Sequence, residues 1–213
     1  MVYLTKSSLV ADPEHVELLR DEFQHRHLVR LPHFVHPEFF TLVERSVAEG
    51  RWERYSGDFD SEEVLRQGAA VALLHFVANW PQMLNFVHQI TGCGPFTWFG
   101  GRVYRMSSGA GHHDDWHTDD VDGRRVAMSI NLSRRGYQGG LLQMRARGGA
   151  ALLAEVANTG PGDATFFRIS KALEHRVTDV LQGEPRVAFA GFFGAARPTL
   201  VDQLHQLAED AGR

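Results

Sequence analysis

The stretch Arg125-Val126-Ala127-Met128-Ser129-Ile130-Asn131-Leu132 alternates between large apolar side chains and small or polar ones. In a β-strand, successive side chains point to opposite faces, so this pattern predicts a strand with one packing face and one open face. The packing face carries the larger side chains, Val126, Met128, Ile130 and Leu132. The open face carries Ala127, Ser129 and Asn131, which leave room for a ligand.

Six further runs rich in Val, Phe, Tyr or Trp lie on either side of this strand, separated by glycines and polar turns. They span residues 96–106, 141–146, 151–156, 164–169, 174–180 and 186–193. Many short strands at regular spacing predict a β-sandwich or a β-barrel rather than a sheet with crossover helices.

Helical patterns dominate the first part of the chain. Asp12-Pro13 is an N-cap followed by proline at the first helical position, and an apolar stripe follows. We expect helices over 13–25, 37–49, 69–78 and 81–91, a strand over 27–31, and a last amphipathic helix over 199–211 that packs on the barrel or forms a homodimer contact. Residues 51–68 are compatible with a lid over a site or with an outer packing layer. The expected organisation is one domain: a mostly helical support at 1–95, a barrel core at 96–195 and a C-terminal helix at 196–213.

The composition is that of an ordinary globular protein, with 213 residues, 43% hydrophobic residues and 23% charged residues. The net charge of -4 argues against nucleic acid as a partner, because phosphate binding needs a concentrated basic surface. We expect no membrane span and no signal peptide, since the apolar runs are short. Cys93 is the single cysteine, which excludes an internal disulfide and favours the cytoplasm.

The motif Trp116-His117-Thr118-Asp119 contains two candidate metal ligands, and His175 is a third. On an extended strand, His117 and Asp119 point to the same side. Two imidazoles and one carboxylate fill one face of an octahedron and leave the other open, as in non-haem Fe(II) oxygenases. Arg186 is expected on a strand adjacent to that of His175, joined by a turn at 182–185, with its guanidinium able to bind a carboxylate in two hydrogen bonds.

These elements, with Gly139-Gly140-Leu141 and the run at 162–167, occur in the order and approximate spacing of a known family. The chain resembles the 2-oxoglutarate-dependent Fe(II) oxygenases, specifically the prolyl-4-hydroxylase-like branch. The resemblance implies a double-stranded β-helix, or jelly roll, braced by helices. It also implies that His117, Asp119 and His175 bind Fe(II), and that Arg186, helped by Asn131, holds the 5-carboxylate of 2-oxoglutarate.

The activity implied is oxidation of an unactivated C–H bond with dioxygen, most simply hydroxylation, with release of succinate and carbon dioxide. The substrate would be an amino acid, a peptide or a small metabolite. Related halogenases lack the carboxylate ligand, so Asp119 favours hydroxylation or desaturation over halogenation. The competing readings are a cupin-like metal protein with a different reaction, a sensor on the same scaffold, and zinc in place of iron.

Several other residues near the motif have open or ordinary interpretations. Trp116 either stacks on a substrate or packs beside the metal strand. His112 and His113 are expected at the surface, and Gly139-Gly140 marks a turn or a close backbone approach. The acidic residues at 114, 115, 120 and 122 are either a solvated loop or a negative pocket mouth that attracts an amine or a guanidine.

Overall fold

The computed structural model describes residues 1–121, 123–157 and 159–195. The helix expected over 199–211 lies outside these residues. Four helices precede most of the strands: α1 (Pro13–Arg26), α2 (Pro37–Ala48), α3 (Ala69–Ala78) and α4 (Pro81–Thr91). All four helices predicted within the described residues are therefore confirmed. Asp12 caps α1, because its carboxylate accepts a hydrogen bond from the Glu14 backbone N–H at 3.1 Å.

Two short strands, β1 (Val2–Leu4) and β2 (Leu9–Ala11), pair with each other near the N-terminus. The main sheet contains eleven of the described strands and is strongly rolled. Its hydrogen-bonded order is β11-β10-β13-β7-β5-β6-β15-β8-β12-β3, with β4 paired to β5. The strands are β3 (Leu28–Leu31), β4 (Arg51–Ser56), β5 (Asp60–Gln67), β6 (Trp98–Met106), β7 (His113–His117), β8 (Arg124–Asn131), β10 (Leu142–Ala146), β11 (Leu152–Val156), β12 (Ala164–Arg168), β13 (Leu173–Val177) and β15 (Arg186–Gly194).

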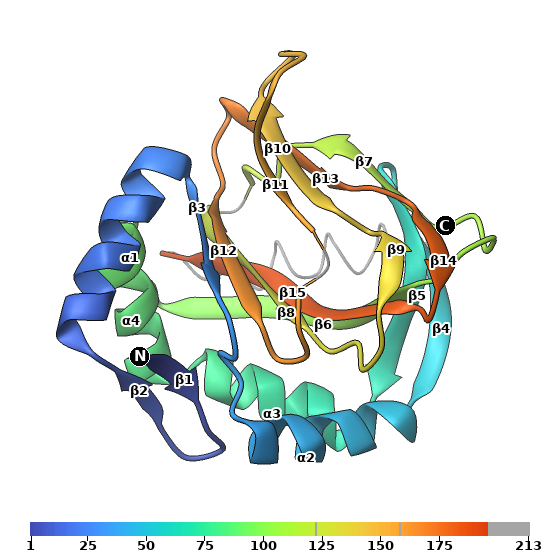
Figure 1. Cartoon of the computed structure of the whole chain (residues 1–213), viewed down its shortest axis with the longest axis horizontal. Helices are drawn as coiled ribbons and strands as arrows, with labels where there is room; N and C mark the ends of the chain where they lie inside the picture. The colour runs from blue at the N-terminus through green and yellow to red at the C-terminus, as the bar shows by residue number, and fades with distance from the viewer. Residues whose placement is uncertain (122, 158, 196–213) are drawn as a thin grey trace, which may run out of the picture.

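The rolled sheet has two facing walls. Figure 1 shows β7, β10, β11 and β13 on one side of the opening, and β6, β8 and β15 on the other. The hairpin β4–β5 connects the walls, since β5 pairs with both β6 and β7. Residues 51–68, whose role the sequence left open, therefore form part of the sheet and close one side of the barrel. The sheet thus includes strands from the first 95 residues.

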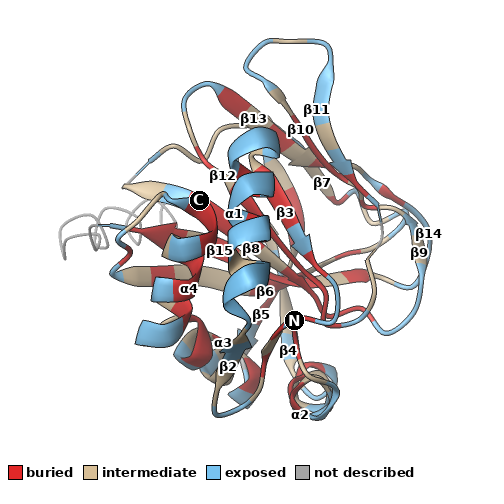
Figure 2. Cartoon of the chain, turned by 60° about the vertical axis from the view of Figure 1, so that its left-hand side comes forward, coloured by how far each residue is buried: buried red, intermediate tan, exposed pale blue. Residues whose placement is uncertain are grey.

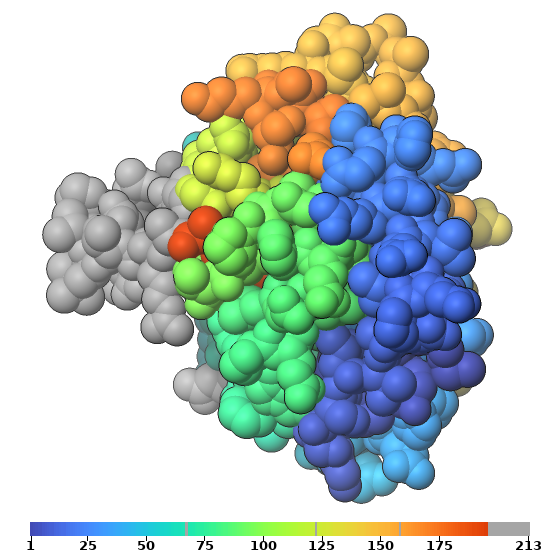
Figure 3. Space-filling model, turned by 90° about the vertical axis from the view of Figure 1, so that its left-hand side faces the viewer, coloured from blue at the N-terminus to red at the C-terminus, as the bar shows by residue number. Residues whose placement is uncertain are grey.

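The helices cover the outer face of the wall that contains β8 and β15. In Figure 1, α2 and α3 lie below this wall and α1 and α4 lie beside it. Figure 3 shows α1 and α4 forming the molecular surface on that side. The Gln24 side chain on α1 donates a hydrogen bond to the Thr91 carbonyl at the end of α4 at 2.6 Å. No helix within the described residues is long and apolar enough to cross a membrane.

The side-chain alternation on β8 divides the interior into two apolar clusters. Val126, Met128 and Ile130 belong to the larger cluster, between the helices and the sheet. That cluster also includes Phe166 and Phe189, which are fully buried. In Figure 2, α1 on the outside of this cluster is largely exposed, while the strands behind it are largely buried. The opposite face of β8 turns into the barrel, as the sequence predicted.

One predicted strand arrangement is wrong. His175 on β13 and Arg186 on β15 are not on adjacent strands, because β7, β5 and β6 lie between β13 and β15 in the sheet. Instead of making a tight hairpin, the chain after β13 forms β14 (Val180–Gly183), which pairs with β9 (Tyr137–Gly139) in a separate two-stranded sheet. This detour carries the chain from one wall to the other, so His175 and Arg186 reach the interior from opposite sides.

Candidate metal centre and active site

The three predicted metal ligands come together at one end of the barrel. His117 is the last residue of β7 and lies directly opposite His175 on β13. Asp119 follows two residues after the end of β7, rather than on the strand itself. Its Oδ2 atom is 3.3 Å from His117 Nε2 and 3.1 Å from His175 Nε2. One ligand atom from each residue lies within 4.8 Å of the others, which is the arrangement that a shared metal ion requires.

The protonation of these side chains also fits a metal site. Burial alone would raise the pKa of Asp119, but hydrogen bonds from His117 and His175 hold it well below its ordinary value. Burial would lower the pKa of His117, yet the bond to Asp119 and the charge of Asp114 raise it to about 9. The same lone pairs that hold protons are the ones a metal ion takes, with proton release. Two imidazoles and one carboxylate are the donor set expected for Fe(II).

Neighbouring groups orient the ligands. His117 Nδ1 donates to the Asp115 carbonyl at 2.7 Å, which directs Nε2 toward Asp119 and His175. Arg124 Nη1 donates to the other carboxylate oxygen of Asp119 at 3.4 Å. The Arg124 guanidinium is itself stacked on the Phe192 ring, 4.4 Å from its centroid. Sequence analysis missed Arg124, because nothing in its local sequence distinguishes it from Arg125.

Arg186 is buried on the facing wall of the same cavity. Its Nη1 donates to the Tyr104 hydroxyl at 2.6 Å, and Tyr104 lies on β6 opposite Ala188. Burial raises the pKa of Tyr104 to about 12, against the effect of the nearby Arg186 charge. Tyr104 therefore keeps its proton at neutral pH. Tyr104 was not predicted, since its position beside Arg186 depends on the pairing of β6 with β15.

A close backbone approach leaves room for Arg186. Gly140 has a φ of +62°, and a Cβ atom there would lie 2.9 Å from Arg186 Cδ and 2.8 Å from Tyr137 Cε2. The close approach predicted at Gly139-Gly140 is confirmed, and its neighbours are the Arg186 stem and the Tyr137 ring.

Asn131 was predicted to assist Arg186, but its hydrogen bonds go elsewhere. Its Nδ2 donates to the Thr159 carbonyl at 2.5 Å and to the Gly160 carbonyl at 3.2 Å. Its Oδ1 accepts from the Ser133 backbone N–H at 2.9 Å. The amide is thus engaged by backbone at the end of β8. Tyr104 makes the contact to Arg186 that the sequence suggested for Asn131.

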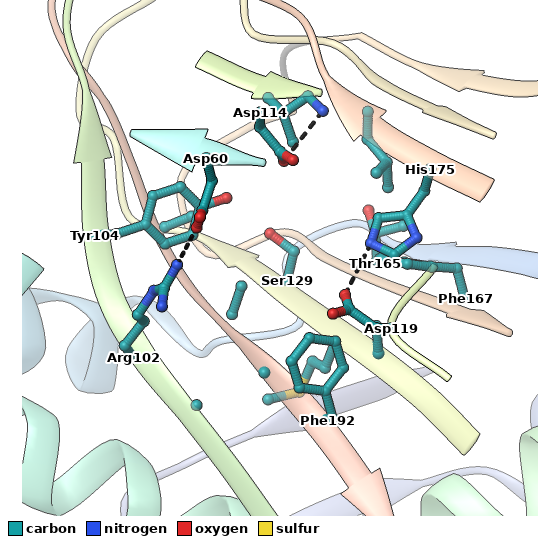
Figure 4. A pocket seen from close by; sticks show the side chains of 18 of the residues that line it. Asp60, Arg102, Tyr104, Asp114, Asp119, Ser129, Thr165, Phe167, His175 and Phe192 are labelled. Atoms are coloured by element: carbon teal, nitrogen blue, oxygen red, sulfur yellow. Dashed lines mark hydrogen bonds and ion pairs between the residues drawn. The ribbon is translucent and has the colours of Figure 1, made fainter. Parts of the chain in front are cut away.

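The triad and Arg186 line one cavity of about 520 Å³. Ala188 and Ala190 on β15 are on its wall together with Ser129 of β8, and these small side chains leave space between Arg186 and the triad. Figure 4 shows Ser129 in the middle of this pocket, with His175 and Asp119 on one side and Tyr104 on the other. A volume of this size suits a small cosubstrate together with part of a second molecule.

The remaining predictions near the motif have clear outcomes. Trp116 points away from the site, with the guanidinium groups of Arg145 and Arg176 at 4.0 and 4.7 Å from its ring, so it packs on the outer face. The prediction that His112 is at the surface is wrong: His112 is buried, and its Nδ1 accepts from the Ser107 N–H at 2.9 Å. Of the acidic residues suggested as a pocket mouth, Asp114 is on the cavity wall, while Asp120 faces Arg125 at 3.9 Å.

Comparison with known proteins agrees with this site. Residues 101–194 match the family model of the 2OG-Fe(II) oxygenase superfamily. A prolyl-4-hydroxylase of Pseudomonas putida has a similar fold, with a TM-score of 0.62 and 19% identity over 85% of this chain and 100% of that one. A prolyl hydroxylase of Trichoplax adhaerens was solved with a peptide fragment of the hypoxia inducible factor oxygen degradation domain. Its TM-score is 0.61 and its identity is 14%, over 85% of this chain and 89% of that one. No curated protein matches the sequence.

A third structure is the epimerase SnoN in complex with Fe³⁺, alpha ketoglutarate and a nogalamycin compound, with a TM-score of 0.60 and 14% identity over 87% of this chain and 85% of that one. The shared fold confirms the predicted double-stranded β-helix. The segment that contains the site, residues 101–194, is the part that matches the 2OG-Fe(II) oxygenase superfamily. This match, the fold and the His117, Asp119 and His175 cluster together support a 2-oxoglutarate-dependent dioxygenase that uses Fe(II) and dioxygen.

Proposed function

We propose that this enzyme hydroxylates an unactivated C–H bond of an amino acid, a peptide or a small metabolite, and converts 2-oxoglutarate to succinate and carbon dioxide. In this proposal His117, Asp119 and His175 bind Fe(II), and Arg186 binds the 5-carboxylate of 2-oxoglutarate. The observation that supports it most directly is the convergence of one ligand atom from each of the three residues within 4.8 Å, in the cavity that Arg186 also lines.

Bound Fe(II) and 2-oxoglutarate supply the oxidising power, by activating dioxygen. The chain's own contribution is to hold these groups in place. β7 and β13 are hydrogen-bonded neighbours, which fixes the separation of His117 and His175. Arg124 holds one carboxylate oxygen of Asp119 and leaves the other directed at the two imidazoles. Side chains fixed in this way would hold Fe(II) beside the cavity in which the cosubstrate and dioxygen would bind.

Arg186 and Tyr104 form a site for a carboxylate. A guanidinium binds a carboxylate through two parallel N–H donors, and this bond is strong where water is excluded. Both side chains are almost completely buried. The Tyr104 hydroxyl accepts from Arg186, which leaves its own proton available for a carboxylate oxygen. Aromatic side chains that line the cavity, among them Phe167 and Phe192, limit the access of water to the reacting groups.

Anaerobic titration of the purified protein with Fe(II) and 2-oxoglutarate tests the proposal. The chelate of the two gives a weak visible charge-transfer band, which we expect for the wild type and not for His175→Ala. Arg186→Ala should retain Fe(II) binding but require far more 2-oxoglutarate. His15→Ala removes an exposed histidine from α1 and serves as the control, with an unchanged band. Tight metal binding without the band would contradict the proposal and favour a cupin-like protein with a different reaction.

A further inference from the structure

We infer that the substrate carries a cationic nitrogen, a protonated amine or a guanidinium, which binds to Asp60 and Glu62 on the cavity wall. This inference rests on the proposed function, since it specifies the kind of molecule that is oxidised at that site. It moves the source of negative charge from the acidic loop suggested by the sequence to the β4–β5 hairpin.

The carboxylates of this site come from β5, and Arg102 on β6 contacts both. Arg102 Nη2 is 2.5 Å from Asp60 Oδ2, and its Nε is 2.6 Å from Glu62 Oε1. All three residues line the cavity that contains the metal triad. Figure 4 shows the Asp60–Arg102 pair across the pocket from Asp119 and His175, with Ser129 between them. A molecule held at Asp60 therefore extends toward the metal ligands.

This group is also separate from the expected position of 2-oxoglutarate. Arg102 lies opposite Ala190 on β15, four residues along the strand from Arg186. At a rise of about 3.3 Å per residue, the backbone positions of Arg102 and Arg186 are about 13 Å apart along the sheet. Asp60 and Glu62 lie on β5, which β6 separates from the strand of Arg186. The part of the cavity beside the Arg102 guanidinium thus remains for the second molecule, the substrate.

Arg102 holds the two carboxylates in place and does not by itself balance their charge. One guanidinium stands between two carboxylates, and one of its faces is covered by the Tyr55 ring at 4.4 Å. Asp114 adds a third carboxylate to the cavity wall. Arg124 is paired with Asp119, and Arg186, whose neighbour Tyr104 is neutral, is expected to bind the carboxylate of 2-oxoglutarate. An anionic substrate group would meet this excess of negative charge, whereas a cation would compensate it.

Glu62 provides a second, independent observation. Its side chain is only 5% exposed, and its Oε1 atom receives no hydrogen bond of good geometry, although Arg102 Nε is close. Burial raises the pKa of Glu62 to about 7, and although Arg102 lowers it, the charges of Asp60 and Asp114 add to the increase. Keeping this buried carboxylate charged is costly, and a cationic ligand group bound beside it would offset that cost.

Aromatic groups beside the carboxylates suit the same ligand. Tyr55 on β4 and Phe59 in the β4–β5 turn both line the cavity. Phe59 is 54% exposed, which is unusual for a phenylalanine, and its ring is stacked beside His117 with 6.0 Å between centroids. Aromatic faces next to carboxylates are a common environment for ammonium and guanidinium groups.

The test compares charged probes with their uncharged counterparts on the anaerobic Fe(II) and 2-oxoglutarate complex. The probes are n-butylguanidine and n-pentylamine, each beside an uncharged analogue, n-butylurea and N-pentylacetamide. Binding is followed as the shift of the charge-transfer band and by calorimetry. We expect the cationic member of at least one pair to bind about tenfold more tightly than its analogue, the effect of one charge-assisted hydrogen bond.

Variants locate the effect. Asp60→Asn and Glu62→Gln should each abolish the preference for the cation while leaving the affinity for 2-oxoglutarate unchanged, and Asp60→Glu should retain the preference. Glu63→Gln is the matched control, because Glu63 is on the same strand but pairs with Arg105 and does not line the cavity. If the band in each variant is normal, folding is intact.

Three results would overturn the inference: no cationic probe binds, neutral probes bind as tightly as cationic ones, or Glu63→Gln has the same effect as Glu62→Gln. Failure of the oxygenase proposal is distinguishable, because it removes the charge-transfer band of the wild type before any substrate probe is added.

Discussion

Replacement of Tyr104 by phenylalanine isolates one hydrogen bond of the proposed 2-oxoglutarate site. The phenol oxygen is 2.6 Å from Arg186 Nη1, and both side chains are buried. The variant keeps the aromatic ring and removes only the hydroxyl, so the cavity gains little volume. Arg186 loses a neutral acceptor, and the bound carboxylate loses a neutral donor.

The magnitude follows from the charges involved. A hydrogen bond to a charged group contributes about 1.5 to 3 kcal/mol, which corresponds to a change of about 10- to 150-fold in a dissociation constant. We therefore expect the Kd for 2-oxoglutarate to rise by at least about tenfold, with an unchanged Kd for Fe(II). The fall in the free energy of unfolding should be about 1 to 3 kcal/mol, the cost of a buried donor left unpaired.

The assay is the anaerobic band titration, with 2-oxoglutarate varied at saturating Fe(II). Tyr3→Phe, on β1 and outside the cavity, is the control for loss of a phenol hydroxyl elsewhere. An unchanged 2-oxoglutarate Kd in Tyr104→Phe would refute the reasoning, since it would mean that the cosubstrate carboxylate does not bind beside this hydroxyl. A loss of Fe(II) affinity would also refute it, because Tyr104 is on the wall facing the ligands.

Three further predictions follow from single positions. The folded-state pKa of Glu62 is raised from 4.5 to about 7, so protonated Glu62 stabilises the folded state fully below pH 4.5, and this stabilisation is lost as the pH rises to 7. In denaturant unfolding, the free energy of unfolding of Glu62→Gln should therefore increase relative to that of the wild type between these pH values, by at most about 3 kcal/mol. A difference that does not change with pH would contradict the burial of Glu62. Gly140→Ala forces a Cβ atom against Arg186 at a φ of +62°, so we expect a loss of about 1 to 3 kcal/mol in unfolding experiments and weaker 2-oxoglutarate binding; normal values for both would show that the loop relaxes freely. Trp116→Ala removes a ring from the outer face, so thermal stability should fall while the Fe(II) and 2-oxoglutarate affinities stay unchanged, and a loss of metal affinity would show that this ring supports His117 directly.

The sequence revealed the parts of the site that depend on local pattern. Alternation on 125–132 predicted which side chains of β8 enter the barrel, because strand geometry fixes that property residue by residue. The ligand motif was recognisable for a similar reason, since His117 and Asp119 lie two residues apart. Site residues whose position depends on strand pairing could not be predicted from the sequence. Tyr104 is beside Arg186 only because Ala188 is in register with Tyr104, and no local feature of either strand specifies that register.

The wrong placement of His175 and Arg186 has the same origin and a clear physical consequence. A short connection with a Gly183 turn favoured a hairpin, but residues 180–183 pair with β9 instead. Pairing between distant segments overrode the local turn signal. The result is a site whose proposed metal ligands lie on one wall and whose proposed carboxylate-binding residue, Arg186, lies on the other. In this proposal the distance between metal and cosubstrate carboxylate is set by the width of the barrel rather than by one loop.

Dependence on strand pairing also explains why the carboxylates proposed to bind the substrate, Asp60 and Glu62, could not be predicted from the sequence. Asp60 and Glu62 belong to a hairpin that reads as a polar, irregular stretch, and they acquire a role only because β5 bridges β6 and β7. His117, His175, Arg186 and Tyr104 are on other strands, and Asp119 follows β7. Side chains of the hairpin can therefore change without moving the metal ligands or the 2-oxoglutarate site. We infer that the hairpin is the element in which substrate preference is encoded, so exchanging its cavity-facing residues should alter the preferred charge of the substrate while the Fe(II) and 2-oxoglutarate affinities remain constant.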